Sequence, residues 1–342
     1  MTTSSDAEGA AAAGPPATPA APSHRHWLVD LGVLAVAVVW GSTYVAMQWS
    51  GRFMSVPVFL FLRFSMGALA VSLLSLRLWR GVNRDELKLG LLFGALLFGI
   101  LFLETLGVRY TLASNAGFLI SLSVMLVPLM ERTFLRVRMP RSIYLLAVVS
   151  LAGCALLTLD DGLSVRSGDL IILAAALIRA GQITLFGSRT KGRELSLLRV
   201  TAIELWVVAA GGLLLALTTP GKSWHEMTRV PGNAWLVVFY LGVLGTAFAF
   251  LVQLYAAKVS SPTRVGLVLS TEPFFAALFA VFLIGDHLGA AQLVGGGLIL
   301  FSALMGRYVD SKQGRKPADP LPTAPAELAP GAAPDASVEA RP

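Results

Sequence analysis

The sequence predicts an all-α membrane protein with ten transmembrane helices, arranged as two inverted five-helix repeats. Three observations predict this class: the composition, apolar windows along most of the chain, and a weak internal repeat. Of the 342 residues, 55% are hydrophobic and only 14% are charged, whereas a soluble domain carries about 25% charged residues. A helix needs about 20 apolar residues to cross the hydrocarbon, and it satisfies its own backbone hydrogen bonds there. We therefore expect most of the surface to contact the lipid bilayer.

The apolar windows predict ten spans joined by short connections. Residues 1–26 and 311–342 lie outside these windows and are rich in Ala and Pro, so we expect two disordered cytoplasmic tails. The span at 143–159 is short for a full crossing. The predicted spans are 27–47, 56–76, 89–108, 113–134, 143–159, 169–188, 198–217, 234–257, 263–284 and 289–308.

The distribution of positive charge predicts the orientation. The formal net charge is +7, which in a soluble protein would point to nucleic acid. If the N-terminus is cytoplasmic, most Lys and Arg residues fall on the cytoplasmic side, as in the cluster Arg132, Arg136, Arg138 and Arg141. This asymmetry follows the positive-inside rule, so we expect both termini in the cytoplasm and no nucleic-acid partner. The high content of Ala, Gly, Leu and Val fits a bacterial inner or plasma membrane.

A weak repeat links two distant stretches. Tyr110 begins "YTLASNAGFLISLSVMLVP", which ends at Pro128, and Tyr255 begins "YAAKVSSPTRVGLVLSTEP", which ends at Pro273. In both, small and polar residues come first, followed by an apolar run and a proline. The two prolines predict kinks in the helices that contain them.

A second correspondence extends the repeat to the start of each half. The stretch "DLGVLAVAVVWGSTYVAMQW" from Asp30 resembles "DLIILAAALIRAGQITLFGS" from Asp169. The repeats then cover 27–159 and 169–308, with five spans in each. Because five is odd, the second copy must enter the membrane from the opposite side. Inverted repeats of this kind are typical of secondary transporters, whose substrate sites lie near the midplane between the repeats.

Three stretches carry a family resemblance: "VVWGSTYVA" at 38–46, "FLFLRF" at 59–64 and "LSTEPFFAALFAVFLIGDHLGAAQLVGGGLIL" at 269–300. Together they resemble the EamA-type branch of the drug/metabolite transporter (DMT) superfamily, over roughly residues 28–308. The resemblance implies a ten-helix carrier, commonly an exporter of amino acids or other small metabolites.

The chain departs from the family pattern at two places. Arg179 stands where the second repeat of the family usually has an aromatic residue. The acidic residue that follows the proline-containing helix is Asp286 in the second half, but its first-half counterpart is Arg141. Arg179 favours an anionic or zwitterionic substrate.

Two charges of opposite sign are expected near the midplane. Glu272 and Arg179 each lie about 14 Å inside their predicted spans, at 1.5 Å per residue. A charge at this depth faces protein or water and has a functional role by default. In one interpretation a substrate carboxylate binds Arg179, and Glu272 gains and loses a proton that couples transport to the proton gradient. In the other, the two residues form a fixed ion pair that orients helices.

Polar residues elsewhere complete the predicted site. Trp40, Thr43 and Tyr44 share one face of the first span, because they are three and four residues apart. Such a face suits a pocket for a zwitterionic or aromatic metabolite, although close packing between helices is the alternative explanation. Arg63 is expected to extend outward to the membrane surface. The remaining candidates for contact with substrate or protons are Gln182, Ser121 and Gln253.

Other function classes fit the sequence less well. An intramembrane enzyme needs a nucleophile with a base or a set of metal ligands, and all four histidines lie outside the spans or at their edges. A channel usually has rings of like charge. An uptake carrier or a drug efflux permease remains an alternative. We expect no cofactor or metal and an ion gradient of H⁺ as the energy source. Gly90 and Gly94 indicate a close-packing surface, which alone is weak evidence for a dimer, so a homodimer stays an open alternative.

Overall fold

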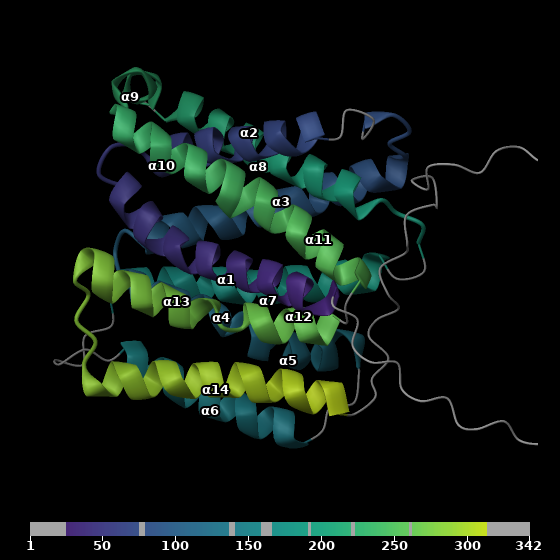
Figure 1. Cartoon of the computed structure of the whole chain (residues 1–342), viewed down its shortest axis with the longest axis vertical. Helices are drawn as coiled ribbons and strands as arrows, with labels where there is room; N and C mark the ends of the chain where they lie inside the picture. The colour runs from purple at the N-terminus through teal and green to yellow at the C-terminus, as the bar shows by residue number, and fades with distance from the viewer. Residues whose placement is uncertain are drawn as a thin grey trace, which may run out of the picture.

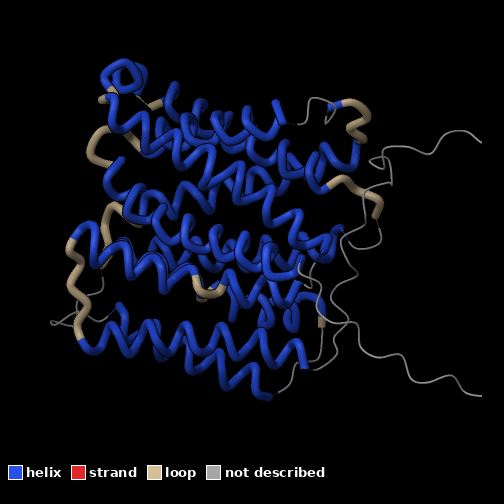
Figure 2. The backbone as a smooth tube through the Cα atoms, in the orientation of Figure 1, coloured by secondary structure: helices blue, strands red, loops and turns tan. Residues whose placement is uncertain are grey.

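The computed structural model describes residues 25–74, 79–136, 141–158, 166–190, 193–219, 223–259 and 262–312. All regular structure in these ranges is helical, and Figure 2 shows no strand among them. Most of the two predicted tails, 1–24 and 313–342, lies outside the described residues. The prediction of an all-α protein is therefore confirmed for the part of the chain that is described.

The elements follow one another closely within the described ranges. In the first half they are α1 (Arg25–Ser50), α2 (Val56–Leu74), α3 (Arg84–Gly107), α4 (Ala113–Ser121), α5 (Ser123–Leu135) and α6 (Arg141–Thr158). In the second half they are α7 (Ser167–Thr190), α8 (Leu197–Thr218), α9 (Ser223–Arg229), α10 (Gly232–Gly242), η2 (Val243–Phe248), α11 (Ala249–Val259), α12 (Pro262–Leu269), α13 (Glu272–Phe279), η3 (Ala280–Ile284) and α14 (Ala290–Lys312). The segments η2 and η3 are π-helical, with a wider turn than an α-helix.

Seven helical stretches in the described ranges are long and apolar enough to cross a membrane. Several consecutive elements join into one stretch, as α4 and α5 do. The seven are Trp27–Ser50, Val56–Leu74, Arg84–Gly107, Ala113–Leu135, Ser167–Thr190, Leu197–Thr218 and Gly232–Ala256. Three shorter apolar helices accompany them: Arg141–Leu156, Glu272–Ile284 and Ala290–Gly306.

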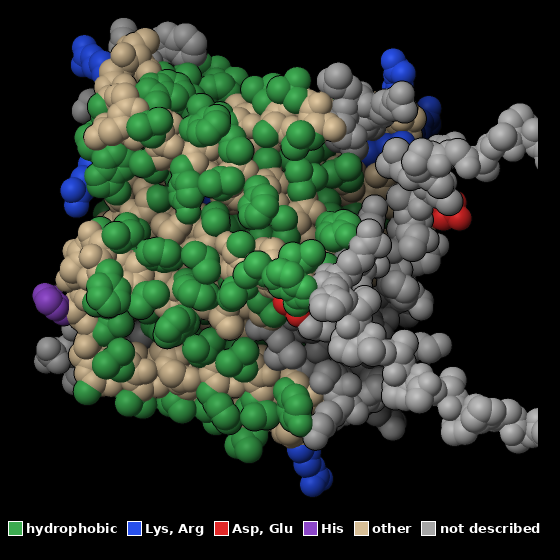
Figure 3. Space-filling model, in the orientation of Figure 1, with side chains coloured by type: hydrophobic (Ala, Val, Ile, Leu, Met, Phe, Trp, Pro, Cys, Tyr) green, Lys and Arg blue, Asp and Glu red, His purple; other side chains and the backbone are tan. Residues whose placement is uncertain are grey.

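The surface has the character of a multi-pass membrane protein. Large apolar side chains point outward along many helices, and Leu73, Leu236 and Phe282 are 67%, 71% and 78% exposed. Figure 3 shows hydrophobic side chains over most of the visible face, with Lys and Arg at its edges. Such a surface would be unfavourable in water and is favourable in lipid.

The helices pack side by side in one bundle (Figure 1). At one end of the view α6 lies along α14, and toward the other end α2 packs on α8. Between them, α1 contacts α13 while α7 contacts α4 and α5. Helix α8 also packs on α3, and α2 on α10 and η2.

Two spans are interrupted, and these interruptions lie beside the centre of the bundle. The regular α-helical hydrogen-bond pattern is interrupted at Leu122, between α4 and α5, and at Ser270 and Thr271, between α12 and α13, although Leu122 and Thr271 keep right-handed helical dihedral angles. Pro273 lies in the first turn of α13. Pro128 lies inside α5, which continues through it, so the first interruption is not at the proline.

Helix α3 begins earlier than its apolar window indicates. Its start is fixed by a capping box, in which the Asn83 side chain accepts a hydrogen bond from the backbone N–H of Glu86, and the Glu86 side chain accepts one from Asn83. Hydropathy alone begins the span near residue 89, because it does not register polar capping residues. The helix therefore projects beyond its apolar part at this end.

Glycines allow the close helix contacts. A Cβ atom on Gly90 would lie 2.7 Å from the side chain of Ile203, and one on Gly94 would lie 2.7 Å from that of Val207. Both partners belong to α8, so this glycine pair packs within the chain. The predicted homodimer therefore cannot use this surface while α3 and α8 remain in contact.

Candidate functional site

A cavity of about 360 Å³ lies between the two halves of the chain. Every side chain that the sequence identifies as a candidate for substrate or proton contact lines it. Helices from both halves contribute equally, with four residues from the first and four from the second. The eight residues are Trp40, Thr43, Tyr44, Ser121, Arg179, Gln182, Gln253 and Glu272. The rest of the lining is mainly apolar.

Glu272 is placed in the cavity by the interruption between α12 and α13. It is the first residue of α13, at the positive end of the helix dipole, which favours a negative charge. The Tyr44 hydroxyl donates a hydrogen bond to Oε1 of Glu272, at 2.9 Å. Tyr44 is 1% exposed, so the wall of the cavity holds this donor in a fixed position. The carboxylate therefore contacts one neutral donor and faces the cavity.

Arg179 has a different partner from the one considered in the sequence. Its Nη2 lies 2.6 Å from Oε2 of Glu104, in the last turn of α3. The contact between α3 and α7 brings these residues together, and the long arginine side chain covers the difference in their depths. The hypothesis of a fixed ion pair between Arg179 and Glu272 is therefore wrong in this structure. Both residues line the cavity, but Glu104 neutralises the arginine.

Arg63 lies inside the bundle, so the expectation that it extends to the membrane surface is wrong. It is 6% exposed and lines the cavity. Its guanidinium carbon lies 5.2 Å from the ring centre of Phe64 and 6.0 Å from that of Phe59. Its Nε donates to the Thr246 hydroxyl at 3.4 Å. Aromatic faces and a hydroxyl from η2 thus replace the water that an outward arginine would reach.

The π-helical segment η2 shapes the same wall. The Trp40 indole Nε1 donates to the carbonyl oxygen of Gly245 at 2.9 Å, and Thr246 Oγ1 donates to the Leu241 carbonyl at 3.0 Å. The wider π turn shifts the backbone from regular α geometry, and π segments of this kind are frequent at functional sites. Gln182 is also tied to the backbone, through a 3.1 Å hydrogen bond to the Phe93 carbonyl.

The family of this chain is found by comparison with known proteins. The EamA-like transporter family matches it twice, over residues 27–159 and again over 166–306. The chain belongs to this family. The two matches divide the EamA-family chain into the same halves whose helices enclose the cavity.

Individual relatives carry transporter names. An uncharacterized transporter of Archaeoglobus fulgidus is 26% identical over 81% of this chain and 84% of its own length. The uncharacterized inner membrane transporter YicL of Salmonella typhimurium is 29% identical over 80% of this chain and 93% of its own. A solved crystal structure matches 82% of this chain and 98% of its own, with a TM-score of 0.56 and 19% identity. This last likeness concerns the fold alone.

In this EamA-family protein, one end of the bundle is closed beside the cavity. Asp286, after η3, accepts hydrogen bonds from the backbone N–H and the hydroxyl of Ser114, at 3.3 and 3.0 Å. The Thr111 hydroxyl donates to Asp169 at the start of α7. Both acids therefore hold the connection between α3 and α4.

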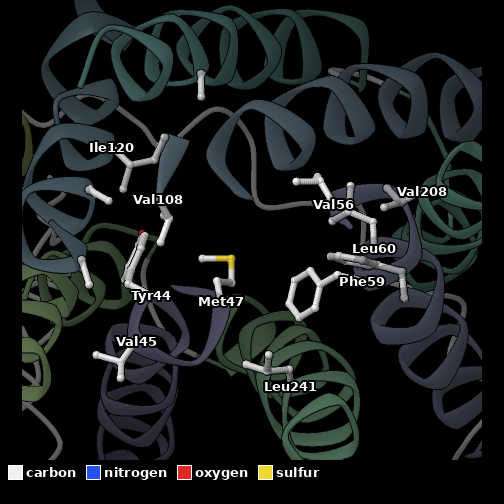
Figure 4. Close-up of a cluster of buried hydrophobic side chains, with 14 of the residues drawn as sticks. Tyr44, Val45, Met47, Val56, Phe59, Leu60, Val108, Ile120, Val208 and Leu241 are labelled. Atoms are coloured by element: carbon white, nitrogen blue, oxygen red, sulfur yellow. The ribbon is translucent and has the colours of Figure 1, made fainter. Parts of the chain in front are cut away.

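Packed apolar side chains seal the space between this connection and Tyr44. Met47, Phe59 and Val108 are 2%, 1% and 0% exposed, and Figure 4 shows Met47 and Val108 beside Tyr44, with Phe59 on the far side of Met47. The Thr105 hydroxyl donates to the sulfur of Met47. Among the described residues, this packing fills the end of the bundle that holds the connection between α3 and α4.

Two cavity residues were missed as site candidates. Glu104 and Arg63 are charged residues inside apolar spans, a pattern that by itself indicates function. Both residues lie near the ends of their predicted spans, where a long side chain can reach either inward to the cavity or outward to the membrane surface. Their positions in the sequence therefore do not show which direction they take.

Proposed function

We propose that this protein is a secondary active transporter of the EamA/DMT type that exports a small metabolite, such as an amino acid or a related anion or zwitterion. The observation that carries the proposal is the cavity between the halves, with its polar candidates contributed equally by both. Two cations and two acids line it, so its lining is formally neutral when all four are ionised. A neutral lining of mixed charge suits a zwitterion better than a simple ion.

We further propose the ten-helix inverted-repeat architecture. Seven long apolar helices and three shorter ones in the described ranges support a count of ten spans. The helix contacts keep their pattern when each helix is replaced by its counterpart in the other half. The pairs α2–α8 and α6–α14 each join two counterparts, and the contact of α1 with α13 corresponds to that of α7 with α5. The positive-inside pattern supports cytoplasmic termini in a bacterial inner or plasma membrane.

Transport in this proposal proceeds by alternating access with proton antiport. In this proposal the contacts of Asp286 and Asp169 and the packed apolar side chains close the outer end of the cavity. The cavity then opens toward the cytoplasm, in the orientation that the positive charges indicate. Glu272 binds the cationic part of the cargo when it is ionised and releases it when it takes a proton. Rocking of one half against the other would then open the sealed end.

Reconstitution into proteoliposomes tests this proposal. With a panel of radiolabelled amino acids, we expect saturable uptake that unlabelled substrate on the opposite side accelerates, and accumulation when a proton gradient is imposed. Protein-free liposomes are the control. Flux without saturation and without acceleration by substrate on the other side would indicate a channel, and dependence on the reverse gradient would indicate an uptake carrier.

A further inference from the structure

Arg63 is a buried cation that makes no ion pair with any carboxylate in the described part of the chain. Its single hydrogen bond there, from Nε to Thr246, is long at 3.4 Å. Arginine is rarely buried without an acidic partner, because an uncompensated charge loses its hydration. Since Arg63 lines the cavity, its terminal N–H groups can be satisfied by a ligand that occupies the cavity.

The guanidinium group is held in place before any ligand arrives. Phe64 and Phe59 flank it at 5.2 and 6.0 Å, and Thr246 fixes the Nε edge. Gly245 lies beside the other edge without crowding it, because even a Cβ there would only make an ordinary contact with Nη2 of Arg63, at 3.7 Å. A donor fixed in this way loses little freedom when it binds its partner.

The other cation of the cavity cannot fill this role equally well. Arg179 already has a carboxylate 2.6 Å away on Glu104, so an anion that bound it would have to displace an ion pair or share it. Arg63 and Glu272 are the two charges of the lining that make no ion pair with a described residue, although Glu104 also attracts Arg63 from a greater distance. They are of opposite sign and come from opposite halves of the chain.

We propose that Arg63 is the specificity-determining residue that binds the carboxylate of the transported molecule. This proposal rests on the transporter function proposed above and assigns the anionic group of its substrate. A guanidinium presents two parallel N–H donors that match the two oxygens of a carboxylate. The apolar lining, which includes Leu97, Leu101 and Phe250, receives the rest of the molecule.

Matched pairs of ligands test the assignment. The probes are leucine, phenylalanine and serine, each compared with its own amide, which keeps the amino group and side chain but lacks the carboxylate. Counterflow in proteoliposomes gives transport, and ligand-induced thermal stabilisation of the purified protein gives binding. For the wild type we expect a preference of about tenfold or more for at least one acid over its amide, because a hydrogen-bonded charge pair supports a change of that size.

Three variants locate the source of that preference. We expect Arg63→Gln to bring the acid-to-amide ratio close to one, and Arg63→Lys to leave an intermediate ratio, since lysine keeps the charge but loses the paired donors. Arg52→Gln removes an exposed arginine outside the cavity and should leave the ratio unchanged. If Arg63→Gln does not fold, Arg63→Lys carries the test.

The outcomes separate this proposal from the transporter function. The role of Arg63 is overturned if the wild type exchanges the compounds without preferring the acid. It is also overturned if the Arg63→Gln protein keeps the preference for the acid. In both cases the transporter proposal stands. An equal loss for acid and amide also overturns the role of Arg63, because it shows a purely structural role. If no compound is exchanged, the transporter proposal fails for this panel, and thermal stabilisation then tests Arg63. Stronger stabilisation by the acid than by the amide, lost in Arg63→Gln, supports the role of Arg63. Equal stabilisation of the wild type by acid and amide overturns that role.

Discussion

The two interrupted helices of this protein have corresponding sequences but break differently. In the first half the break is at Leu122, and α5 then runs through Pro128. In the second half the break is at Ser270 and Thr271, directly before Glu272 and Pro273. When the two tyrosine-to-proline stretches are aligned, Val127 occupies the position of Glu272.

This difference explains why only one of the two similar helices carries an ionisable side chain at this position. A break directly before an acid places its carboxylate at the start of a helix, where the helix dipole favours a negative charge. A break further from the proline leaves Val127 within a continuous helix, where an apolar side chain is favourable. The second-half helix is therefore the one suited to change its charge during transport.

The largest effect is expected from Glu272→Gln. Glutamine keeps the size of the side chain and can still accept the Tyr44 hydrogen bond, but it cannot ionise. Loss of a charge-assisted contact should lower proton-driven transport by about tenfold or more, and the remaining exchange should no longer respond to an imposed proton gradient. Transport in proteoliposomes at several values of the gradient measures both effects.

Glu194→Gln is the matched control for that substitution. Glu194 is exposed and lies outside the cavity, so the same chemical change there should leave gradient dependence unchanged. If transport by Glu272→Gln still depends fully on the proton gradient, Glu272 does not couple transport to protons. The two interrupted helices would then not differ in this function.

A smaller effect, on stability, is expected where α1 supports the second broken helix. A Cβ on Gly41 would lie 2.6 Å from Phe275 Cβ and 2.8 Å from the backbone nitrogen of Ala276. Because backbone cannot move aside easily, Gly41→Ala should destabilise the protein by about 1–3 kcal/mol. Thermal unfolding in detergent measures this change.

The other half supplies the control for this contact. In the aligned stretches the buried Ala180 already stands at the position of Gly41, so α7 accommodates a Cβ at this point. A Cβ on the neighbouring Gly181 would meet only the Met130 sulfur, at 3.7 Å, and Gly181→Ala should leave the unfolding temperature nearly unchanged. Equal losses from both substitutions would contradict the difference in closeness.

Much of the fold could be predicted because it depends on local patterns. Apolar length predicts helices that cross lipid, and a spacing of three and four residues places Trp40, Thr43 and Tyr44 on one face. The eight candidate residues share one cavity because charged and polar residues in an apolar span have few other places to lie.

The contacts inside the cavity could not be predicted in this way. Whether Arg179 pairs with Glu272 or with Glu104 depends on how α3 packs against α7, which no local pattern records. The inward direction of Arg63 likewise depends on Thr246, which is far away in the sequence. The site of each helix break also differs between two stretches whose patterns are alike.

The smallest effects should distinguish the two prolines by sign. Pro128→Ala restores a backbone donor inside α5, worth about 0.5–1.5 kcal/mol, and removes the contact of the proline ring with the preceding turn. Together these gains should exceed the cost of about 0.4–1 kcal/mol for a freer unfolded chain, so the protein should be slightly stabilised. Pro273 lies in the first turn of α13, where no such bond is lost and a fixed backbone angle is favourable. Pro273→Ala should therefore destabilise the protein by about 0.4–1 kcal/mol, because it frees the unfolded chain. Thermal unfolding of both variants beside the wild type measures the signs, and shifts in the same direction would mean that the two prolines act alike despite their different places in the helices.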